Sequence, residues 1–321
     1  IQNDASISLE YANGQRSSNV ICRLPSSSEV ILGDPTFCKD YGVRYAYMTG
    51  AMANGIASEE LVIAMGREKL LASFGAAGLL PDRLEAAILK IKEALPQGPF
   101  AFNLIHSPNE DLLEREGVNL YLKHGIKVVE ASAFLGLTKH IVRYRLAGLQ
   151  KNSNGEIEIG HRVIAKISRR EVATRFMEPA PEKMVQELVA EGLISQDQAE
   201  LSRHVSMADD IIVEADSGGH TDNRPLVCLL PSMLALRDQI QQQYNYSYSI
   251  RIGAAGGIST PSSALGAYAM GAAFIVTGSV NESCIESGVS AGVKELLAKA
   301  GMADVMMAPA ADMFEMGVQL Q

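Results

Sequence analysis

The chain is poor in cysteine and carries no cysteine motif. Its 321 residues include four scattered cysteines, and none of these has the C-x-x-C spacing of a zinc or redox site. Scattered cysteines suit a reducing compartment and no signal peptide is visible, so we expect a cytoplasmic protein. The chain begins at Ile1 without a methionine and stops at Gln321 without a helix stop. We therefore expect it to be a trimmed portion of a longer protein.

The sequence also lacks an excess of positive charge and long apolar runs. It has 28 Lys and Arg against 37 Asp and Glu, a formal net charge of −9. This balance argues against nucleic acid as the main partner, because phosphate binding requires a basic surface. No apolar run approaches the roughly 20 residues that span a bilayer, so we expect no membrane partner. Hydrophobic residues make up 47% of the chain, which is typical of a globular protein with an ample core.

Motifs for metal binding and for nucleophilic catalysis are missing as well. Among the six histidines no pair has metal-ligand spacing, which predicts that no metal is bound. No G-x-S-x-G turn is present, and Cys228 and Cys284 have no base motif beside them. The sequence therefore does not support a covalent nucleophile.

What the sequence does have, from Tyr45 onward, is an alternation of short β-rich runs and helical stretches. Eight strands each followed by a helix predict a protein of the α/β class that folds as a (β/α)₈ TIM barrel. A doubly wound open sheet is the rival, but it usually has fewer strands. The expected strands are Tyr45–Thr49, Leu70–Phe74, Phe100–Ile105, Lys127–Ala131, Val163–Ile167, Ile211–Ala215, Ser249–Ala254 and Phe274–Thr277.

Prolines mark the expected starts of several helices. Pro81, Pro231 and Pro261 each stand where a first-turn proline belongs, and Thr260 is a suitable N-cap for the last of these helices.

Two stretches interrupt the repeat, and the first residues lie outside it. We expect residues 1–35 to form a small irregular segment of strands and loops, and residues 36–321 to form the barrel. Residues 145–162 are typical of a β-hairpin before the fifth strand. Residues 178–208 predict a helical insertion after strand 5, with a capping box at Ser195 and Gln198. This insertion is either a lid over the barrel or a decorative or oligomer-forming element.

Glycine-rich loops follow the last two expected strands. Glycines let backbone N–H groups approach an anion closely, and barrels commonly build a phosphate site from the loops after strands 7 and 8. Tight turns that require a positive φ are the alternative interpretation. The cofactor-binding residues predicted here are Ala255, Gly256, Gly257, Gly278 and Ser279.

The loops after the early strands are small and apolar. They suit a flat ring lying against the backbone rather than a sugar or a peptide. The residues predicted to contact such a ring are Gly50, Ala51, Met52 and Gly75.

Two polar side chains on strands fit the edge of such a ring. Asn103 offers an amide that can both donate to and accept from the edge of a flavin pyrimidine. Lys166, pointing inward from strand 5, fits the flavin N1–C2=O locus, where negative charge builds on reduction. A buried ion pair with Glu130 or Glu214 is the alternative interpretation of this lysine.

His220 is the strongest catalytic candidate. It follows the diglycine Gly218–Gly219 on the loop after strand 6, among polar residues, and both glycines are predicted to bind the cofactor. A histidine at that place can donate a proton near neutral pH or hold a substrate carbonyl. A structural or solvated histidine is the alternative. Of the other histidines, only His106 in the strand 3 loop is placed to reach the site.

Longer motifs around these loops resemble a known group of proteins. They are similar to the nitronate monooxygenase/enoyl reductase superfamily of FMN barrels. More narrowly, they resemble the PfaD family, the trans-acting enoyl reductases of bacterial polyunsaturated fatty acid synthases, with relatives in trans-acyltransferase polyketide systems. The likeness covers residues 33–321. The segments are Tyr47–Gly55, Ala101–Pro108, Glu214–Pro225 and Met307–Gly317.

The resemblance implies one bound FMN, with its phosphate on the late glycine loops and its ring against Gly50, Ala51, Met52 and Asn103. It also implies a catalytic role for His220, NADPH as reductant, and an enoyl thioester on an acyl carrier protein as substrate. A homodimer and a chain that continues past residue 321 follow from the same likeness. The alternative enzyme is an FMN oxidase of the nitronate monooxygenase type, which uses O₂ in place of an enoyl acceptor.

An acidic carrier protein would need a local basic patch on this acidic chain. The sequence offers two, and a solvated helix face is the alternative interpretation of each. The first patch is Lys139, His140, Arg143 and Arg145, and the second is Arg169 and Arg170.

Overall fold

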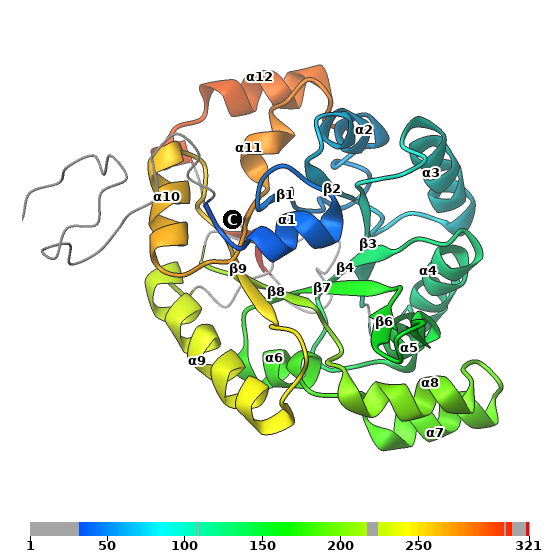
Figure 1. Ribbon diagram of the computed structural model, residues 1–321. Coiled ribbons are helices and arrows are strands. Elements are labelled where there is room, and N and C mark those ends of the chain that lie inside the picture. Colours follow the sequence, from blue (N-terminus) through cyan, green and yellow to red (C-terminus); the bar gives the residue numbers. More distant parts are fainter. Residues whose placement is uncertain are drawn as a thin grey trace, which may run out of the picture. The chain divides into compact units, whose positions relative to one another are not determined.

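The computed structural model describes residues 32–106, 108, 110–216, 224–304, 306–309 and 319–320. Within this part of the chain, eight parallel strands close into a barrel (Figure 1). The predicted TIM barrel is confirmed, and each strand lies within two residues of its expected place. The strands, in barrel order, are β1 (Tyr47–Thr49), β2 (Leu71–Phe74), β3 (Ala101–Ile105), β4 (Val128–Ser132), β7 (Arg162–Ile167), β8 (Asp210–Glu214), β9 (Arg251–Ala255) and β10 (Ile275–Thr277).

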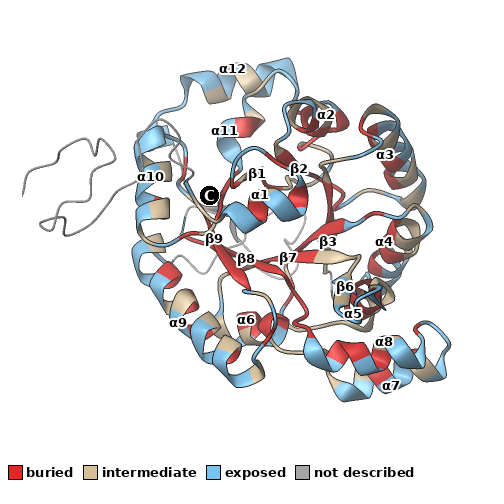
Figure 2. Ribbon diagram, viewed as in Figure 1, coloured by how far each residue is buried: buried red, intermediate tan, exposed pale blue. Residues whose placement is uncertain are grey.

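A ring of helices covers the outside of the barrel. The strands are buried and most helices bury only the face toward them, as Figure 2 shows. The ring consists of α2 (Glu59–Arg67), α3 (Pro81–Ala94), α4 (Asp111–Lys123), α5 (Lys139–Ala147), α6 (Arg170–Met177), α9 (Leu226–Tyr244), α10 (Pro261–Ala269) and α11 (Ser279–Glu282). After α11, the chain continues with α12 (Ala291–Lys299), a 3₁₀ turn at Met302–Asp304, and the paired strands β11 (Ala308–Pro309) and β12 (Gln319–Leu320).

Side chains of the strands fill the barrel in layers. Successive residues of a strand point to opposite faces, so alternate residues enter the barrel and the others meet the helices. A middle layer is apolar, and two positions further along β2, β3, β4, β7 and β8 the inward residues become polar. The apolar layer is Met48, Leu71, Ala101, Val128, Ile164, Ile212 and Phe274. The polar layer, here called the inner ring, is Ser73, Asn103, Glu130, Lys166 and Glu214.

Helix α1 (Pro35–Tyr41) closes the amino-terminal end of the barrel and crosses its centre in Figure 1. The Asp34 side chain caps this helix by accepting a hydrogen bond from the Thr36 N–H at 2.8 Å. Phe37 is fully buried and stacks on Phe274 with 4.5 Å between ring centroids. This end of the barrel is therefore closed, and the predicted site residues lie toward the opposite, carboxyl-terminal mouth.

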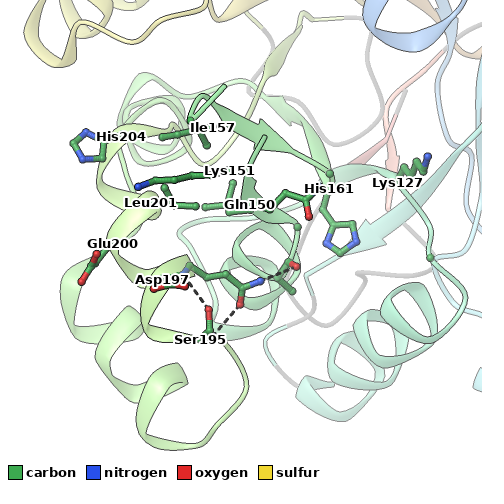
Figure 3. A pocket seen from close by; sticks show the side chains of 17 residues that line it. Lys127, Gln150, Lys151, Ile157, His161, Ser195, Asp197, Glu200, Leu201 and His204 are labelled. Atoms are coloured by element: carbon green, nitrogen blue, oxygen red, sulfur yellow. Dashed lines mark hydrogen bonds between the residues drawn. The ribbon is translucent and has the colours of Figure 1, made fainter. Parts of the chain in front are cut away.

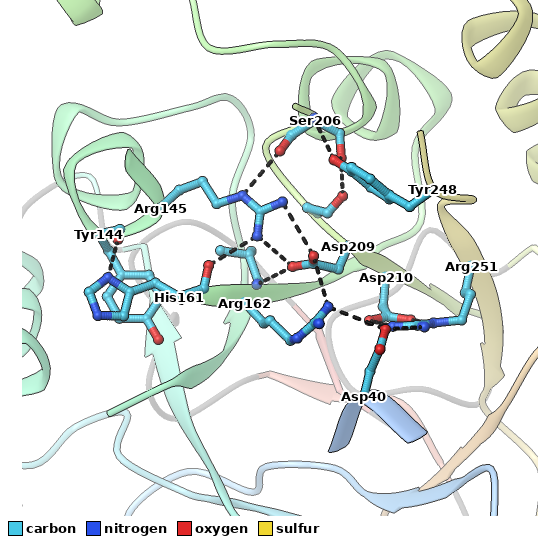
Figure 4. A network of polar contacts seen from close by, with 12 residues as sticks. Asp40, Tyr144, Arg145, His161, Arg162, Ser206, Asp209, Asp210, Tyr248 and Arg251 are labelled. Atoms are coloured by element: carbon cyan, nitrogen blue, oxygen red, sulfur yellow. Dashed lines mark hydrogen bonds and ion pairs between the residues drawn. The ribbon is translucent and has the colours of Figure 1, made fainter. Parts of the chain in front are cut away.

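Buried ion pairs fasten α1 to the strands (Figure 4). Arg251 contacts both carboxylate oxygens of Asp210 at 2.6 and 2.9 Å and Asp40 of α1 at 2.7 Å. Burial raises the pKa of Asp210 although Arg251 opposes this. Arg162 reaches Asp40 at 3.3 Å. The sequence did not reveal this network, because its ion pairs join residues that lie far apart in the chain.

Arg145 is the most deeply buried arginine of this network. Its side chain is fully buried, and its guanidinium donates to Asp209 at 2.6 Å and to two backbone carbonyls. Burial alone would raise the pKa of Asp209, but Arg145 and Arg162 lower it below its ordinary value. Arg145→Leu is therefore expected to lower the free energy of unfolding by about 3–5 kcal/mol, because it leaves a buried carboxylate short of a partner.

Urea denaturation measures this loss of stability. Arg203→Leu serves as the control, because its ion pair with Glu182 is exposed and is expected to contribute at most about 1 kcal/mol. An Arg145→Leu loss no larger than that of the control would contradict the prediction.

The two insertions lie on the outer wall of the barrel. Strands β5 (Leu149–Lys151) and β6 (Ile157–Ile159) pair as an antiparallel hairpin, and α7 (Glu182–Ala190), α8 (Gln196–Leu201) and a 3₁₀ turn at Ser202–His204 form the helical insertion. The predicted capping box at Ser195 and Gln198 is present, and Gln198 donates to the Ala147 carbonyl of α5 at 3.0 Å.

The helical insertion does not cover the mouth. It follows α6 in the chain and leads into the amino end of β8, which is the end opposite the mouth. Its helices pack on α5 and β5 at the periphery of the barrel (Figure 1). The lid interpretation is therefore wrong for these residues, and the decorative or oligomer-forming alternative remains. None of the helices described above is both long enough and apolar enough to cross a membrane.

Candidate functional site

Lys166 stands at the centre of the inner ring. Its Nζ lies 3.6 Å from Oε1 of Glu130 and 3.7 Å from Oε1 of Glu214. Burial alone would lower the pKa of Lys166, but Glu214 and Glu130 raise it above its ordinary value. The ion pair that was the alternative interpretation is therefore present, and it involves both glutamates. The side chain of Lys166 is 18% exposed and is still able to face a ligand at the mouth. The role of Lys166 in cofactor binding stays a prediction.

Glu130 connects the lysine to the loop after β1. It is fully buried on β4, and its Oε2 accepts a hydrogen bond from the Ala51 N–H at 2.8 Å. Its Oε1 accepts no hydrogen bond from any described residue, and neither does the buried hydroxyl of Ser73. Buried polar atoms without a partner are rare in folded proteins, and a ligand is one explanation for them. Sequence analysis considered Glu130 only as a partner of Lys166.

Asn103 presents less hydrogen-bonding capacity than the sequence indicated. Its Nδ2 donates to the Glu130 backbone carbonyl at 3.0 Å and to the Ser132 hydroxyl at 2.9 Å. Both amide hydrogens are thus used, and the backbone carbonyl, which can only accept, fixes which amide atom faces it. The prediction that Asn103 can both donate and accept is corrected: toward a ligand it offers Oδ1, an acceptor.

The early loops pack tightly against one another. A Cβ on Gly75 would lie 1.7 Å from the Met52 carbonyl oxygen, so this glycine is required for loop packing. A Cβ on Gly50 would lie 3.0 Å from Val276 and 3.9 Å from Glu130 Oε1. The small residues at these positions therefore allow the loops after β1 and β2 to pack closely beside the inner ring.

The late loops have the conformations that their glycines permit. Gly256 and Gly257 adopt φ values of 93° and 67°, as the turn interpretation required. A Cβ on Gly278 would meet nothing within 4 Å. Within the described residues, the backbone N–H groups of Gly256, Gly257, Gly278 and Ser279 find no protein acceptor. The two interpretations of these glycines, a tight turn and an anion site, are therefore compatible, because the turn exposes the N–H donors that an anion needs.

A side-chain cluster that sequence analysis missed anchors the second of these loops. The Thr277 hydroxyl bonds to the Tyr47 hydroxyl at 2.8 Å and to the Asn281 amide at 2.7 Å. Thr277 ends β10 and Asn281 lies four residues later in α11, and this spacing was the available signal. These bonds fix the backbone on both sides of Gly278.

The predicted catalytic residue and its diglycine lie outside the described residues. His220, Gly218 and Gly219 belong to residues 217–223. The two ends of this segment are joined, because the Asp216 N–H donates to the Arg224 carbonyl at 2.9 Å. The role of His220 stays a prediction.

His106 faces away from the inner ring. Asn103 points inward, so strand alternation turns His106 toward the helices. Its Nδ1 bonds Glu114 of α4 at 2.9 Å and its ring stacks on Phe134 at 5.4 Å. This geometry indicates a structural histidine rather than a second catalytic one.

The first predicted basic patch is not a patch of free cations. Arg145 is buried, Lys139 pairs with Glu191 at 2.7 Å, and His140 bonds Asp111 at 2.9 Å. Arg143 donates to the neutral amide of Asn119 at 2.6 Å and keeps its charge, so the patch is reduced and the carrier-protein surface there stays a prediction. Arg169 and Arg170 lie where β7 leads into α6, beside the mouth, and that surface stays a prediction.

A pocket of about 910 Å³ lies away from the mouth (Figure 3). It is lined by the β5–β6 hairpin and α8, with Lys127, Lys151 and His161 among its residues. The Nδ1 of His161 bonds the Tyr144 carbonyl at 2.9 Å. The glycine loops and the inner ring are absent from its lining, so we place the functional site at the mouth and not here.

The closed barrel, the glycine loops after β9 and β10 and the charged inner ring define the chain as a TIM-barrel protein with a ligand site at its carboxyl-terminal mouth. The chain belongs to the nitronate monooxygenase family, whose model matches residues 40–315. Members of this family are flavin-dependent oxidoreductases. The resemblance stated from the sequence motifs is thus confirmed.

Two curated proteins illustrate the likeness. A polyunsaturated fatty acid synthase polypeptide of Thraustochytrium sp. is 51% identical over 97% of this chain and 21% of its own length. The polyketide biosynthesis protein PksE of Bacillus subtilis is 45% identical over 90% of this chain and 38% of its own length. The chain therefore spans well under half of either relative.

A solved structure agrees in both sequence and fold. The enoyl reductase domain of MlnA, from the macrolactin biosynthesis cluster of Bacillus amyloliquefaciens, superposes with a TM-score of 0.87 and 40% identity. The match covers 91% of this chain and 66% of that one.

Proposed function

We propose that the chain is an FMN-dependent enoyl reductase that uses NADPH to reduce the 2,3-double bond of enoyl thioesters. The thioesters would be carried on acyl carrier protein during polyunsaturated fatty acid or polyketide synthesis. The observation that carries this proposal is the match to the MlnA enoyl reductase domain over 91% of the chain. The synthase relatives support the biosynthetic setting.

The residues at the mouth fit FMN. The loops after β1 and β2 present small residues beside the inner ring, and four backbone N–H groups of the late loops are available to a phosphate. Buried oxygens of Glu130 and Ser73 that accept no hydrogen bond from a described residue lie in the same part of the barrel. When bound, FMN supplies hydride transfer, from NADPH to the ring and from the ring to the β carbon of the enoyl thioester.

The chain's own residues have separate tasks in this proposal. Gly256, Gly257, Gly278 and Ser279 bind the phosphate through their backbone N–H groups. Asn103 Oδ1 accepts a hydrogen bond from the ring edge, because its amide hydrogens are already used. Lys166 balances negative charge at the pyrimidine side of the ring.

His220 acts on the substrate. As hydride reaches the β carbon, negative charge develops on the thioester carbonyl oxygen. His220, or a backbone N–H of the Gly218–Gly219 turn, stabilises that oxygen. A proton then reaches the α carbon from His220 or from water.

The nitronate oxidase is the second candidate, and the description of the matching family is the observation behind it. It would use O₂ to reoxidise the flavin in place of an enoyl acceptor. The identity to a solved enoyl reductase domain argues for the first candidate.

The visible absorption spectrum tests whether flavin is bound and reducible. The purified protein, incubated with FMN and desalted, is expected to show the two bands of oxidised flavin. These bands are expected to bleach with NADPH in the absence of air. A protein that stays colourless after incubation with FMN would overturn the proposed function.

A further inference from the structure

Glu130 occupies an unusual position for a carboxylate. It is fully buried at the middle of β4, and its Oε2 is held by the Ala51 N–H at 2.8 Å. Its Oε1 lies 3.6 Å from Lys166 Nζ, an ion-pair distance that is too long for a hydrogen bond, and no other described residue donates to it. The carboxylate is thus fixed in place with one oxygen still able to act electrostatically on a neighbour.

The carboxylate of Glu130 offsets the charge of Lys166. The two residues come from β4 and β7, which are adjacent in the barrel. The side chain of Lys166 is 18% exposed and that of Glu130 is 0% exposed, so solvent screens the interaction between them weakly. A ligand at the mouth therefore meets less positive charge than Lys166 alone would offer it.

We propose that Glu130 is a positioning residue that sets the reducing power of the bound flavin by offsetting the charge of Lys166. This inference rests on the FMN binding of the proposed function. Reduction adds electrons to the ring and negative charge to its pyrimidine side. A fixed carboxylate next to Lys166 disfavours that charge, so the reduced flavin gives up its hydride more readily to an enoyl acceptor.

Glu130→Gln separates the charge of this residue from its shape. The glutamine still has an oxygen that can accept from the Ala51 N–H, but it carries no charge. The bound flavin is expected to become easier to reduce, with the ratio of reduced to oxidised flavin rising at least tenfold at a fixed potential. For a two-electron couple this is an upward shift of about 30 mV.

Dye equilibration under anaerobic conditions measures this potential without any substrate turnover. Glu114→Gln is the matched control, because Glu114 is also a buried glutamate but bonds His106 and Thr138 on the helix side of the barrel. Its flavin is expected to keep the wild-type potential. An unchanged ratio in Glu130→Gln, or an equal change in both variants, would overturn the inference.

Lys166→Met provides a second measurement if Glu130→Gln does not hold flavin. Removing the ammonium leaves both glutamates in place, so the ratio of reduced to oxidised flavin at a fixed potential is expected to fall at least tenfold. A ratio equal to that of the wild type would contradict the inference. Failure of the wild-type protein itself to bind FMN would instead overturn the proposed function, so the two failures are distinguishable.

Discussion

His220→Ala is expected to slow enoyl reduction about 100-fold or more while leaving flavin reduction by NADPH much less affected. A positioned acid or hydrogen-bond donor contributes about 10²–10⁴-fold to such a step. Charge develops on the thioester oxygen only in the enoyl half-reaction, so the loss should fall there. Stopped-flow absorbance at the flavin bands measures each half-reaction separately. FMN binding is expected to remain, since the phosphate donors lie on other loops.

His204→Ala is the matched control for this substitution. His204 is exposed in the 3₁₀ turn after α8, on the outer wall and away from the mouth. Both half-reactions are expected to proceed at the wild-type rate in this variant. An equal loss in the two half-reactions of His220→Ala would count against its assignment to the substrate.

Gly278→Asp is expected to weaken FMN binding about 100-fold or more. The new carboxylate would stand beside the backbone donors that the phosphate needs, and hydrogen bonds to a charged group contribute about 1.5–3 kcal/mol each. The new side chain has space, because a Cβ on Gly278 meets nothing within 4 Å. Quenching of flavin fluorescence during titration of the apoprotein measures the dissociation constant.

Gly266→Asp tests whether the added charge itself matters. Gly266 lies in α10, and a Cβ there also meets nothing within 4 Å. This variant is expected to bind FMN as tightly as the wild type. Retained tight binding in Gly278→Asp would place the phosphate elsewhere.

The barrel could be predicted from the sequence because its signal is repeated. Each strand is a short buried run, and eight such runs separated by helical stretches leave few alternative folds. The exact residue at which a helix begins was harder to predict. Pro231 was expected to open a helix, but α9 begins at Leu226 behind Pro225, and Pro231 lies inside it. A proline at the first turn and one further along a helix have the same local sequence signature, and only the preceding residues distinguish them.

The placement of the helical insertion required three-dimensional information. Its capping box was visible in the sequence, but whether it covers the mouth depends on which end of a strand it enters. Because α6 already completes the unit after β7, the added helices return at the amino end of β8. Counting one helix per strand before assigning the insertion would have shown this.

The candidate site was predictable in its residue types but not in its pairings. Asn103 and Lys166 were found because a polar residue in a buried strand stands out. That Asn103 has already used both amide hydrogens, and that Glu130 reaches across to Ala51, depends on contacts between residues far apart in the chain. Glu130 carries the same signal as Lys166, a charged residue two positions after an apolar inward one. Parity along the strands thus identifies the whole inner ring.

The most direct test of the proposed activity is the acceptor that reoxidises the flavin. The FMN-loaded protein is reduced with one equivalent of NADPH without air, and is then mixed either with crotonyl thioester or with air-saturated buffer. An enoyl reductase is expected to regain its visible bands faster with the thioester and to form the saturated product. Reoxidation by air but not by the thioester would contradict the enoyl reductase and indicate the oxidase instead.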